Sequence, residues 1–287
     1  MVREFKLLNE KGQIYSLMDI KNYCLLTEPN GLGYSYSTEY EQLGNTFLEN
    51  LRRLEQGKID GVVNFLNYDN YKKFIDFIEK SESLKFSYKI PFKEGIKEYL
   101  KDVNIQAITK TQKLINGILS ETVNFDCISL WYEKVTAIYA IEPKTNEMRW
   151  DFKWDSTFYD YDTRSQDFVN EGHVEAPILL EINGNTENPK IELYVEGELK
   201  QSVSFAVEIQ EDEKLLYSTK EADFYIMKQN VDGTKEDLYK YNDNLVVDFA
   251  NDNVIRIPKN KSCKLVLSAD NEITNAKMTI LTYYKAV

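Results

Sequence analysis

The segment VVNFLNYDNYKKFIDFIEKSESLKFSYKIP, residues 62–91, completes the stretch 22–91 that decides the fold of this chain. Four apolar residues within it recur at i, i+3, i+4 and i+7, the spacing of one stripe on an α-helix. They are Tyr71, Phe74, Ile75 and Ile78. A β-branched and aromatic run at 62–66 precedes this stripe, and an alternating run at 84–90 follows it. The segment therefore predicts a strand, a helix and a second strand.

Signals at both ends bound this helix. Asn67 or Asp69 can cap the first turn, and Asp69 also complements the positive end of the helix dipole. Lys80 and Ser81 close the last turn. The helix is therefore expected between residues 67 and 81.

The rest of the first half is expected to be mainly extended. Short apolar runs at 5–7 and 14–17 flank a turn at 10–12, and further runs occupy 103–124 and 125–132. These runs are rich in β-branched and aromatic residues, which favour strands. The first half is therefore predicted to be mostly β, with one strong helix.

The segment 46–58 is ambiguous. Its apolar residues fit a helix that ends at Gly57, although the segment continues into a clear strand. These residues are Phe47, Leu48, Leu51 and Leu54. The periodicity favours a helix here, and tertiary contacts are able to override it.

From residue 155 onward the pattern is all-β. Alternating apolar runs are separated by two-residue turn signals at 183–184, 196–197 and 232–233. Strands at this spacing predict a β-sandwich. A length of 287 residues also suggests two domains, since a domain averages roughly 150 residues. We place these domains at 1–142 and 143–287.

An aromatic strand is expected at the junction of the two domains. Large apolar residues alternate there with polar ones, so that one face of the strand is wholly apolar. They are Met148, Trp150, Phe152 and Trp154. Two uses of this face remain open, namely buried packing at the junction and docking on another subunit.

Charge and hydropathy exclude several classes of protein. The formal net charge is −12, which argues against binding to nucleic acid because such proteins need a basic face. Charged residues at Arg3, Glu4 and Lys6 stand where a secretory signal would need an apolar run, so none is expected. No apolar stretch reaches the about 20 residues that a membrane helix needs.

The residues that most often carry chemistry form no recognisable site. Cys24, Cys127 and Cys263 are far apart and lack C-x-x-C spacing, which predicts buried thiols rather than disulfides or a zinc site. His173 is the single histidine, in a loop without partners that would mark a triad or a metal site. We therefore assign no catalytic, cofactor-binding or metal-binding residue.

An acidic cluster offers a possible calcium site. It lacks the central glycine and the terminal glutamate of an EF-hand loop, so a solvated loop is the preferred interpretation. The cluster consists of Asp155, Asp160, Asp162 and Asp167.

Three tyrosines of the second half could stack against a sugar, although packing is the commoner use of such residues. They are Tyr225, Tyr239 and Tyr241. A pair of carboxylates at the separation of a glycosidase site cannot be recognised from the sequence.

The order of these elements resembles tailed-phage distal tail proteins. In the first half the resemblance lies in a strand that runs into a Tyr- and Phe-rich helix and a second strand, at 64–71, 77–78 and 84–88. In the second half it lies in the segments 177–184, 188–191, 230–233, 238–239, 248–249 and 254–258. Two features depart from the family, the helical periodicity of 46–58 and the residues 259–262 in place of a glycine after Pro258.

The resemblance implies a structural protein of the virion and no enzymatic activity. It implies an N-terminal domain that forms a ring, typically a hexamer, and a C-terminal jelly-roll or galectin-like sandwich. The expected partners are the tail tube protein, a tail-tip or hub protein and receptor-binding proteins. The protein would be made in the bacterial cytoplasm and located in a phage tail or a prophage-derived particle.

Two other functions stay open at this stage. The jelly roll could serve as a carbohydrate-binding adhesin that recognises a cell-wall saccharide, because this architecture is used both for lectins and for plain spacers. A glycoside-active enzyme is the third and weakest hypothesis. Ring formation, glycan binding and turnover of a polysaccharide distinguish the three.

Overall fold

The computed structural model describes residues 3–19, 24–93, 95–110, 114–115, 117–140, 164–238, 245–246, 254–271 and 275–287. Its contacts divide the chain into two compact units. Unit 1 consists of Met1–Glu133 and Tyr284–Val287, and unit 2 of Lys134–Tyr283. The first stretch of unit 1 thus ends at Glu133, whereas the sequence analysis placed the domain boundary at residue 142. Unit 1 also includes the segment Tyr284–Val287.

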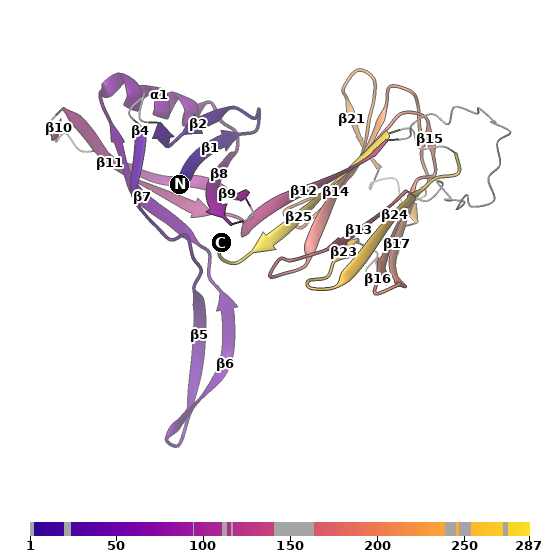
Figure 1. The fold of residues 1–287 in the computed structure, drawn as a ribbon, viewed down its shortest axis with the longest axis horizontal. Helices are drawn as coiled ribbons and strands as arrows, with labels where there is room; N and C mark the ends of the chain where they lie inside the picture. Colours follow the sequence, from indigo (N-terminus) through magenta and orange to yellow (C-terminus); the bar gives the residue numbers. More distant parts are fainter. Residues whose placement is uncertain are drawn as a thin grey trace. The chain divides into compact units, whose positions relative to one another are not determined.

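Unit 1 is built from antiparallel strands and one helix (Figure 1). Its elements are β1 (Glu4–Asn9), β2 (Ile14–Ser16), β3 (Met18–Asp19), β4 (Cys24–Asn30), β5 (Tyr36–Leu43), β6 (Thr46–Leu54), β7 (Lys58–Phe65), α1 (Tyr68–Glu79), β8 (Leu84–Phe92), β9 (Gly95–Thr109), β10 (Leu114–Ile115), β11 (Ile118–Cys127) and the start of β12 (Trp131–Ala140). The main sheet runs β9-β11-β7-β4-β3, while β8 joins β9 to β1, and β1 pairs with β2.

The predicted helix is confirmed as α1, with Asn67 as its N-cap. The Asn67 side-chain oxygen accepts a hydrogen bond from the backbone N–H of Asn70 at 3.0 Å. The apolar stripe packs on the strands, since the Phe74 ring lies 5.3 Å from Phe65 of β7 and 5.4 Å from Tyr15 of β2, centroid to centroid. The predicted strands on either side are β7 and β8.

The helix favoured for 46–58 is wrong. This segment forms β6 and then the start of β7, and β6 pairs with β5 from Leu43↔Thr46 to Tyr36↔Leu54. The run 125–132 is also not one strand, because β11 ends at Cys127 and β12 begins at Trp131. Between them the Ser129 hydroxyl accepts a hydrogen bond from the backbone N–H of Asp102 at 2.8 Å, which fixes the bend.

Besides the larger part of β12, the described part of unit 2 contains further strands, which are joined by turns and loops. They are β13 (Arg164–Val169), β14 (Ala176–Asn183), β15 (Thr186–Glu187), β16 (Lys190–Val195), β17 (Glu198–Phe205), β18 (Glu208–Ile209), β19 (Lys214–Lys220), β20 (Asp223–Gln229), β21 (Lys235–Asp237), β22 (Leu245–Val246), β23 (Arg256–Ile257), β24 (Ser262–Ser268) and β25 (Asn275–Tyr284). One sheet contains β21-β20-β19-β14-β25 in this order, and another contains β13-β24-β16-β17-β22.

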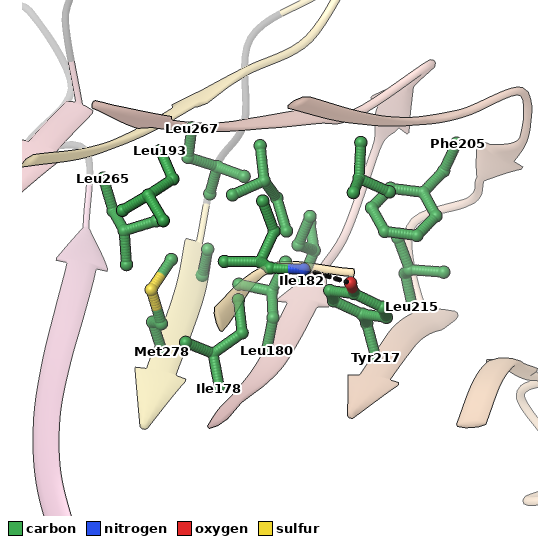
Figure 2. Packing of buried hydrophobic residues seen from close by; sticks show 14 of the residues in the cluster. Ile178, Leu180, Ile182, Leu193, Phe205, Leu215, Tyr217, Leu265, Leu267 and Met278 are labelled. Atoms are coloured by element: carbon green, nitrogen blue, oxygen red, sulfur yellow. Dashed lines mark hydrogen bonds between the residues drawn. The ribbon is translucent and has the colours of Figure 1, made fainter. Parts of the chain in front are cut away.

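These two sheets pack face to face around an apolar core, as Figure 2 shows. Ile182 and Leu215 come from the first sheet, and Leu193 and Leu265 from the second. The buried Tyr217 hydroxyl accepts a hydrogen bond from the backbone N–H of Ile255 at 3.4 Å (Figure 2). The fold class predicted from the sequence, mainly β with a C-terminal sandwich, is confirmed.

In the described part of the chain, no helix combines the length and the apolar character that crossing a membrane requires.

Candidate assembly surface

The hairpin formed by β5 and β6, residues 36–54, is called the arm from here on. Its strands pair only with each other, and it extends away from the sheet of unit 1 (Figure 1). No residue of β5 or β6 is buried. An isolated two-stranded hairpin is only marginally stable in water, so the arm depends on its base or on a partner for order.

The outer part of the arm carries large apolar side chains on both faces. Directly paired residues share a face, so the pairs Leu43↔Thr46 and Glu41↔Leu48 place the two leucines together. The alternate pairs Gln42↔Phe47 and Tyr40↔Glu49 place two aromatic rings on the other face. The exposed fractions are 63% for Leu43, 51% for Leu48, 60% for Tyr40 and 67% for Phe47. Exposed apolar side chains that lie next to one another are a feature of surfaces that bind another molecule.

Side-chain contacts fix the base of the arm. The Tyr36 ring lies between two cations, with the Arg52 guanidinium carbon 4.1 Å and the Lys285 ammonium 5.4 Å from its centroid. Lys285 also donates a hydrogen bond to the Tyr36 hydroxyl at 2.7 Å. The Ser35 hydroxyl donates to the Glu55 carboxylate at 2.6 Å, where the chain enters and leaves the arm. The base therefore holds both strands.

A close backbone approach leads into the arm. Gly31 has a φ of +79°, and a Cβ atom there would lie 1.7 Å from the carbonyl oxygen of Lys58. No other residue type fits this position without moving β4 or β7. Glycine therefore sets the path by which the chain leaves β4 toward the arm.

A cavity of about 530 Å³ lies at the base of the arm, within unit 1. Residues of the arm base, of β9 and of the bend after β11 line it, among them Glu55, Gly57, Lys101, Cys127 and Lys285. Lys101 is only 3% exposed, and burial lowers its pKa. Burial raises the pKa of the neighbouring Cys127 thiol.

Of the residues that the sequence singled out for chemistry, His173 and Asp167 lie within the described part of unit 2. His173 is exposed in the turn between β13 and β14, and its backbone N–H donates to the carbonyl of Tyr283 at 2.7 Å. Asp167 lies in β13 opposite Lys264, whereas Asp155, Asp160 and Asp162 lie outside the described residues. Within the described ranges, no three His, Cys, Asp or Glu side chains are grouped as metal ligands.

The tyrosine platform is described only in part. Tyr225 lies in β20 opposite Ser218 of β19, and burial raises its pKa. Tyr239 and Tyr241, like the aromatic strand at 148–154, lie outside the described residues. The three cysteines are buried free thiols, as expected.

Sequence reasoning missed the arm, although one signal for it was present. Gly44 and Asn45 separate β5 from β6, and Gly44 has a φ of +63°. A Gly-Asn pair between two runs is a signal of a two-residue hairpin. The helical spacing of the apolar residues in 46–58 concealed it.

The region that contains the arm and α1 matches a known family. Residues 4–128 match the family model of the distal tail protein N-terminal domain. These residues form a distal tail protein domain. The family that the sequence resembles is thereby confirmed for this region, and the family is one of structural components of phage tails and baseplates.

Solved structures from phage tails and baseplates share the fold of this chain. One is a chain of the phage P2 baseplate in its activated conformation with calcium, 18% identical, with a TM-score of 0.68 and coverage of 100% of both chains. A chain of the same baseplate with strontium is 17% identical, with a TM-score of 0.68. A third structure is the SPP1 Dit protein, described as a paradigm of the hub adsorption apparatus of phages that infect Gram-positive bacteria. It is 11% identical, with a TM-score of 0.56 and coverage of 96% of this chain and 98% of that one. No curated protein sequence matches the chain.

Proposed function

We propose that this protein is a structural hub of a phage baseplate, in which six copies close into a ring through residues 1–142. The observation that carries the proposal is the arm, whose apolar residues are exposed on both faces. A second copy of the chain that covers the arm removes these side chains from water. Burial of a side chain of this size contributes about 1.5–3 kcal/mol.

The shape of the arm supports a ring rather than a two-fold dimer. Eight residues of β5 span about 25 Å at the rise of an extended strand. We expect an arm of this length to reach a surface of the neighbouring copy that differs from the arm itself. Such a head-to-tail contact repeats from copy to copy and forms a ring when the rotation closes.

The proposed role is structural and not enzymatic, and the proposed location is the tail of a virion or of a prophage-derived particle. The ring would connect the tail tube protein on one side to a tail-tip protein on the other. Residues 143–287, which include the sandwich, would contact receptor-binding proteins. The domain match and the baseplate structures that share the fold support this assignment.

Light scattering coupled to size-exclusion chromatography tests the ring over a range of protein concentrations. We expect a mass six times that of the 33.6 kDa chain for the protein alone, or that mass plus the mass of the bound tube protein once this protein is added. The double variant Leu43→Ser, Phe47→Ser, which changes one apolar residue on each face, should reduce the mass to that of a monomer.

The matched control changes the polar partners of the same two pairs, Thr46→Ser and Gln42→Ser. It should leave the ring intact, because these side chains contribute little apolar area. A wild-type chain that stays monomeric at every concentration, even beside the tube protein, contradicts the proposal. So does a double variant that assembles as well as the wild type.

A further inference from the structure

The cavity at the base of the arm contains a lysine where the strand pattern calls for an apolar residue. In β9, Lys101 lies directly opposite Phe86 of β8. Paired residues share a face, and the neighbouring pairs on this face, Leu84↔Val103 and Tyr88↔Tyr99, are buried. The side chain of Lys101 is buried as well, with 3% of the residue exposed. A cation on the core face is costly unless a negative charge accompanies it.

No carboxylate of the described chain pairs with this lysine. Its ammonium lies 4.9 Å from the centroid of the Trp131 ring, on the face of the indole. Its other contact is the thiol of Cys127, whose pKa is raised by burial, so that the sulfur stays protonated near neutral pH. Neither partner supplies a negative charge. A counter-ion for the Lys101 ammonium would therefore have to come from another molecule.

Space for that group exists beside the ammonium. Gly57 lines the same cavity, and a Cβ atom built on it would lie 3.3 Å from the Lys101 nitrogen and 3.5 Å from the Cys127 sulfur. Its φ lies outside the positive range, so its backbone conformation does not require glycine. The missing side chain therefore serves to leave room between the ammonium and the cavity.

The charges around the cavity favour an anion. Lys285 is a second basic residue of the lining, and Glu55 is the one acidic residue among the described residues that line the cavity. The Glu55 carboxylate accepts a hydrogen bond from Ser35 at 2.6 Å, and no ion pair joins it to Lys101 in the described chain. A volume of about 530 Å³ is ample for a small acid or for a side chain of another polypeptide.

We propose that this cavity binds a carboxylate, which pairs with Lys101 and is assisted by Lys285. The carboxylate comes either from an acidic side chain of another protein of the assembly or from a free organic acid. The inference is independent of the ring, because the cavity lies within unit 1 of a single chain.

The test follows Lys101 in the full chain by NMR, with lysine labelled with ¹³C at Cε. The resonance of Lys101 is the one that disappears in Lys101→Met. The probes are succinate, the blocked tripeptide acetyl-Gly-Glu-Gly-amide and its glutamine counterpart. We expect the Lys101 resonance to shift saturably with succinate or with the glutamate peptide, and not with the glutamine peptide. A shift with succinate alone identifies a free acid, and a shift with the peptide identifies a protein side chain.

Calorimetry with the probe that binds gives the size of the effect. Affinity in Lys101→Met should fall about tenfold or more, the usual result of removing a charged hydrogen-bond partner. Lys97→Met, on the same face of β9 but outside the cavity lining, is the matched control and should bind like the wild type. Gly57→Ala keeps the lysine but fills the space beside it, and should lose the shift while the Lys101 resonance remains.

Folding of the variants is checked by thermal unfolding. Lys101→Met should unfold at the same or a higher temperature, because an apolar residue replaces an unpaired buried cation. If no carboxylate moves the Lys101 resonance, or if the glutamine peptide moves it equally, the inference is wrong. It is equally wrong if Gly57→Ala and Lys101→Met both bind like the wild type.

Discussion

Unit 1 contains two long antiparallel hairpins, the arm (β5–β6) and β8–β9, and they use their apolar residues in opposite ways. In β8 the large side chains alternate strictly, so that Leu84, Phe86 and Tyr88 share one face and are buried. In the arm, Leu43 with Leu48 and Tyr40 with Phe47 occupy opposite faces and all are exposed. One apolar face suffices to close a core within the chain. The single chain covers neither face of the arm, and these exposed side chains are the ones that the proposed contact with another copy would bury.

The largest difference between the two hairpins is expected in the free energy of unfolding after one phenylalanine of each is replaced by alanine. Phe86→Ala should lower the free energy of unfolding by about 3–5 kcal/mol, because it leaves a cavity among packed rings. The Phe86 ring lies 5.5 Å from Phe125 and 6.2 Å from Trp131, centroid to centroid. Phe47→Ala on the arm should change the same quantity by no more than about 0.5 kcal/mol, because the ring is exposed in the single chain.

Denaturant unfolding of the two variants at low protein concentration, where rings are absent, makes this measurement. The wild-type chain is the reference for both. Equal losses for Phe86→Ala and Phe47→Ala would contradict the distinction between the two hairpins, since they would place both rings in a core.

A smaller effect is expected where the chain enters the arm. Gly31→Ala combines a φ of +79° with a Cβ atom 1.7 Å from the Lys58 carbonyl oxygen, so β4 and β7 must separate. The free energy of unfolding should fall by about 1–3 kcal/mol, the usual range for strain of this kind. Gly44→Ala is the matched control, because its φ is also positive but nothing lies within 4 Å of the added atom.

Circular dichroism during urea unfolding compares these two variants. Because Gly31 also directs the chain into the arm, Gly31→Ala should weaken ring formation as well as stability. A Gly31→Ala chain as stable as Gly44→Ala would show that β4 relaxes freely and that the close approach does not constrain the arm.

The smallest effect concerns the lysine on the core face of β9. Burial holds the pKa of Lys101 below its usual value of 10.5 in the folded chain. Between the lowered pKa and 10.5 the unfolded chain binds more protons than the folded chain, so stability from this group rises with pH. The advantage of Lys101→Met over the wild type should therefore be greatest near neutral pH and shrink as the pH approaches 10.5.

Urea unfolding of both chains from pH 7 to pH 10.5 measures this difference. Repeating the pair in a Cys127→Ala background removes the titration of the neighbouring thiol. A difference that stays constant over the whole range would mean that the ammonium is not desolvated in the folded chain.

The fold could be predicted where one physical signal dominates. The stripe of α1 and the alternation of β8 and β14 each leave a single apolar face, and each was placed correctly. The arm was not predicted, because a strand with apolar residues on both faces shows no alternation of apolar and polar residues in its sequence. Phe47, Leu51 and Leu54 then fit the helical spacing by coincidence.

The cavity lay beyond sequence reasoning for a different reason. Its lining comes from the base of the arm, from β9, from the bend after β11 and from Lys285. No local pattern connects these segments. One partial signal existed, because Lys101 interrupts the alternation of Tyr99 and Val103 in β9 with a charge. Only the pairing of Lys101 with Phe86 of β8 shows that it lies on the core face. From the sequence alone, this lysine cannot be distinguished from one that faces solvent.

Unit 1 is discontinuous, since Tyr284–Val287 belong to it although all of unit 2 lies between in the sequence. The Tyr284 ring meets Tyr99 edge to face at 5.4 Å, and Lys285 contacts Tyr36 at the base of the arm. Because a polypeptide is synthesised from its N-terminus, unit 1 receives this segment only after the residues of unit 2 have been made. A chain shortened before Tyr284 would leave Tyr36 without its contact to Lys285.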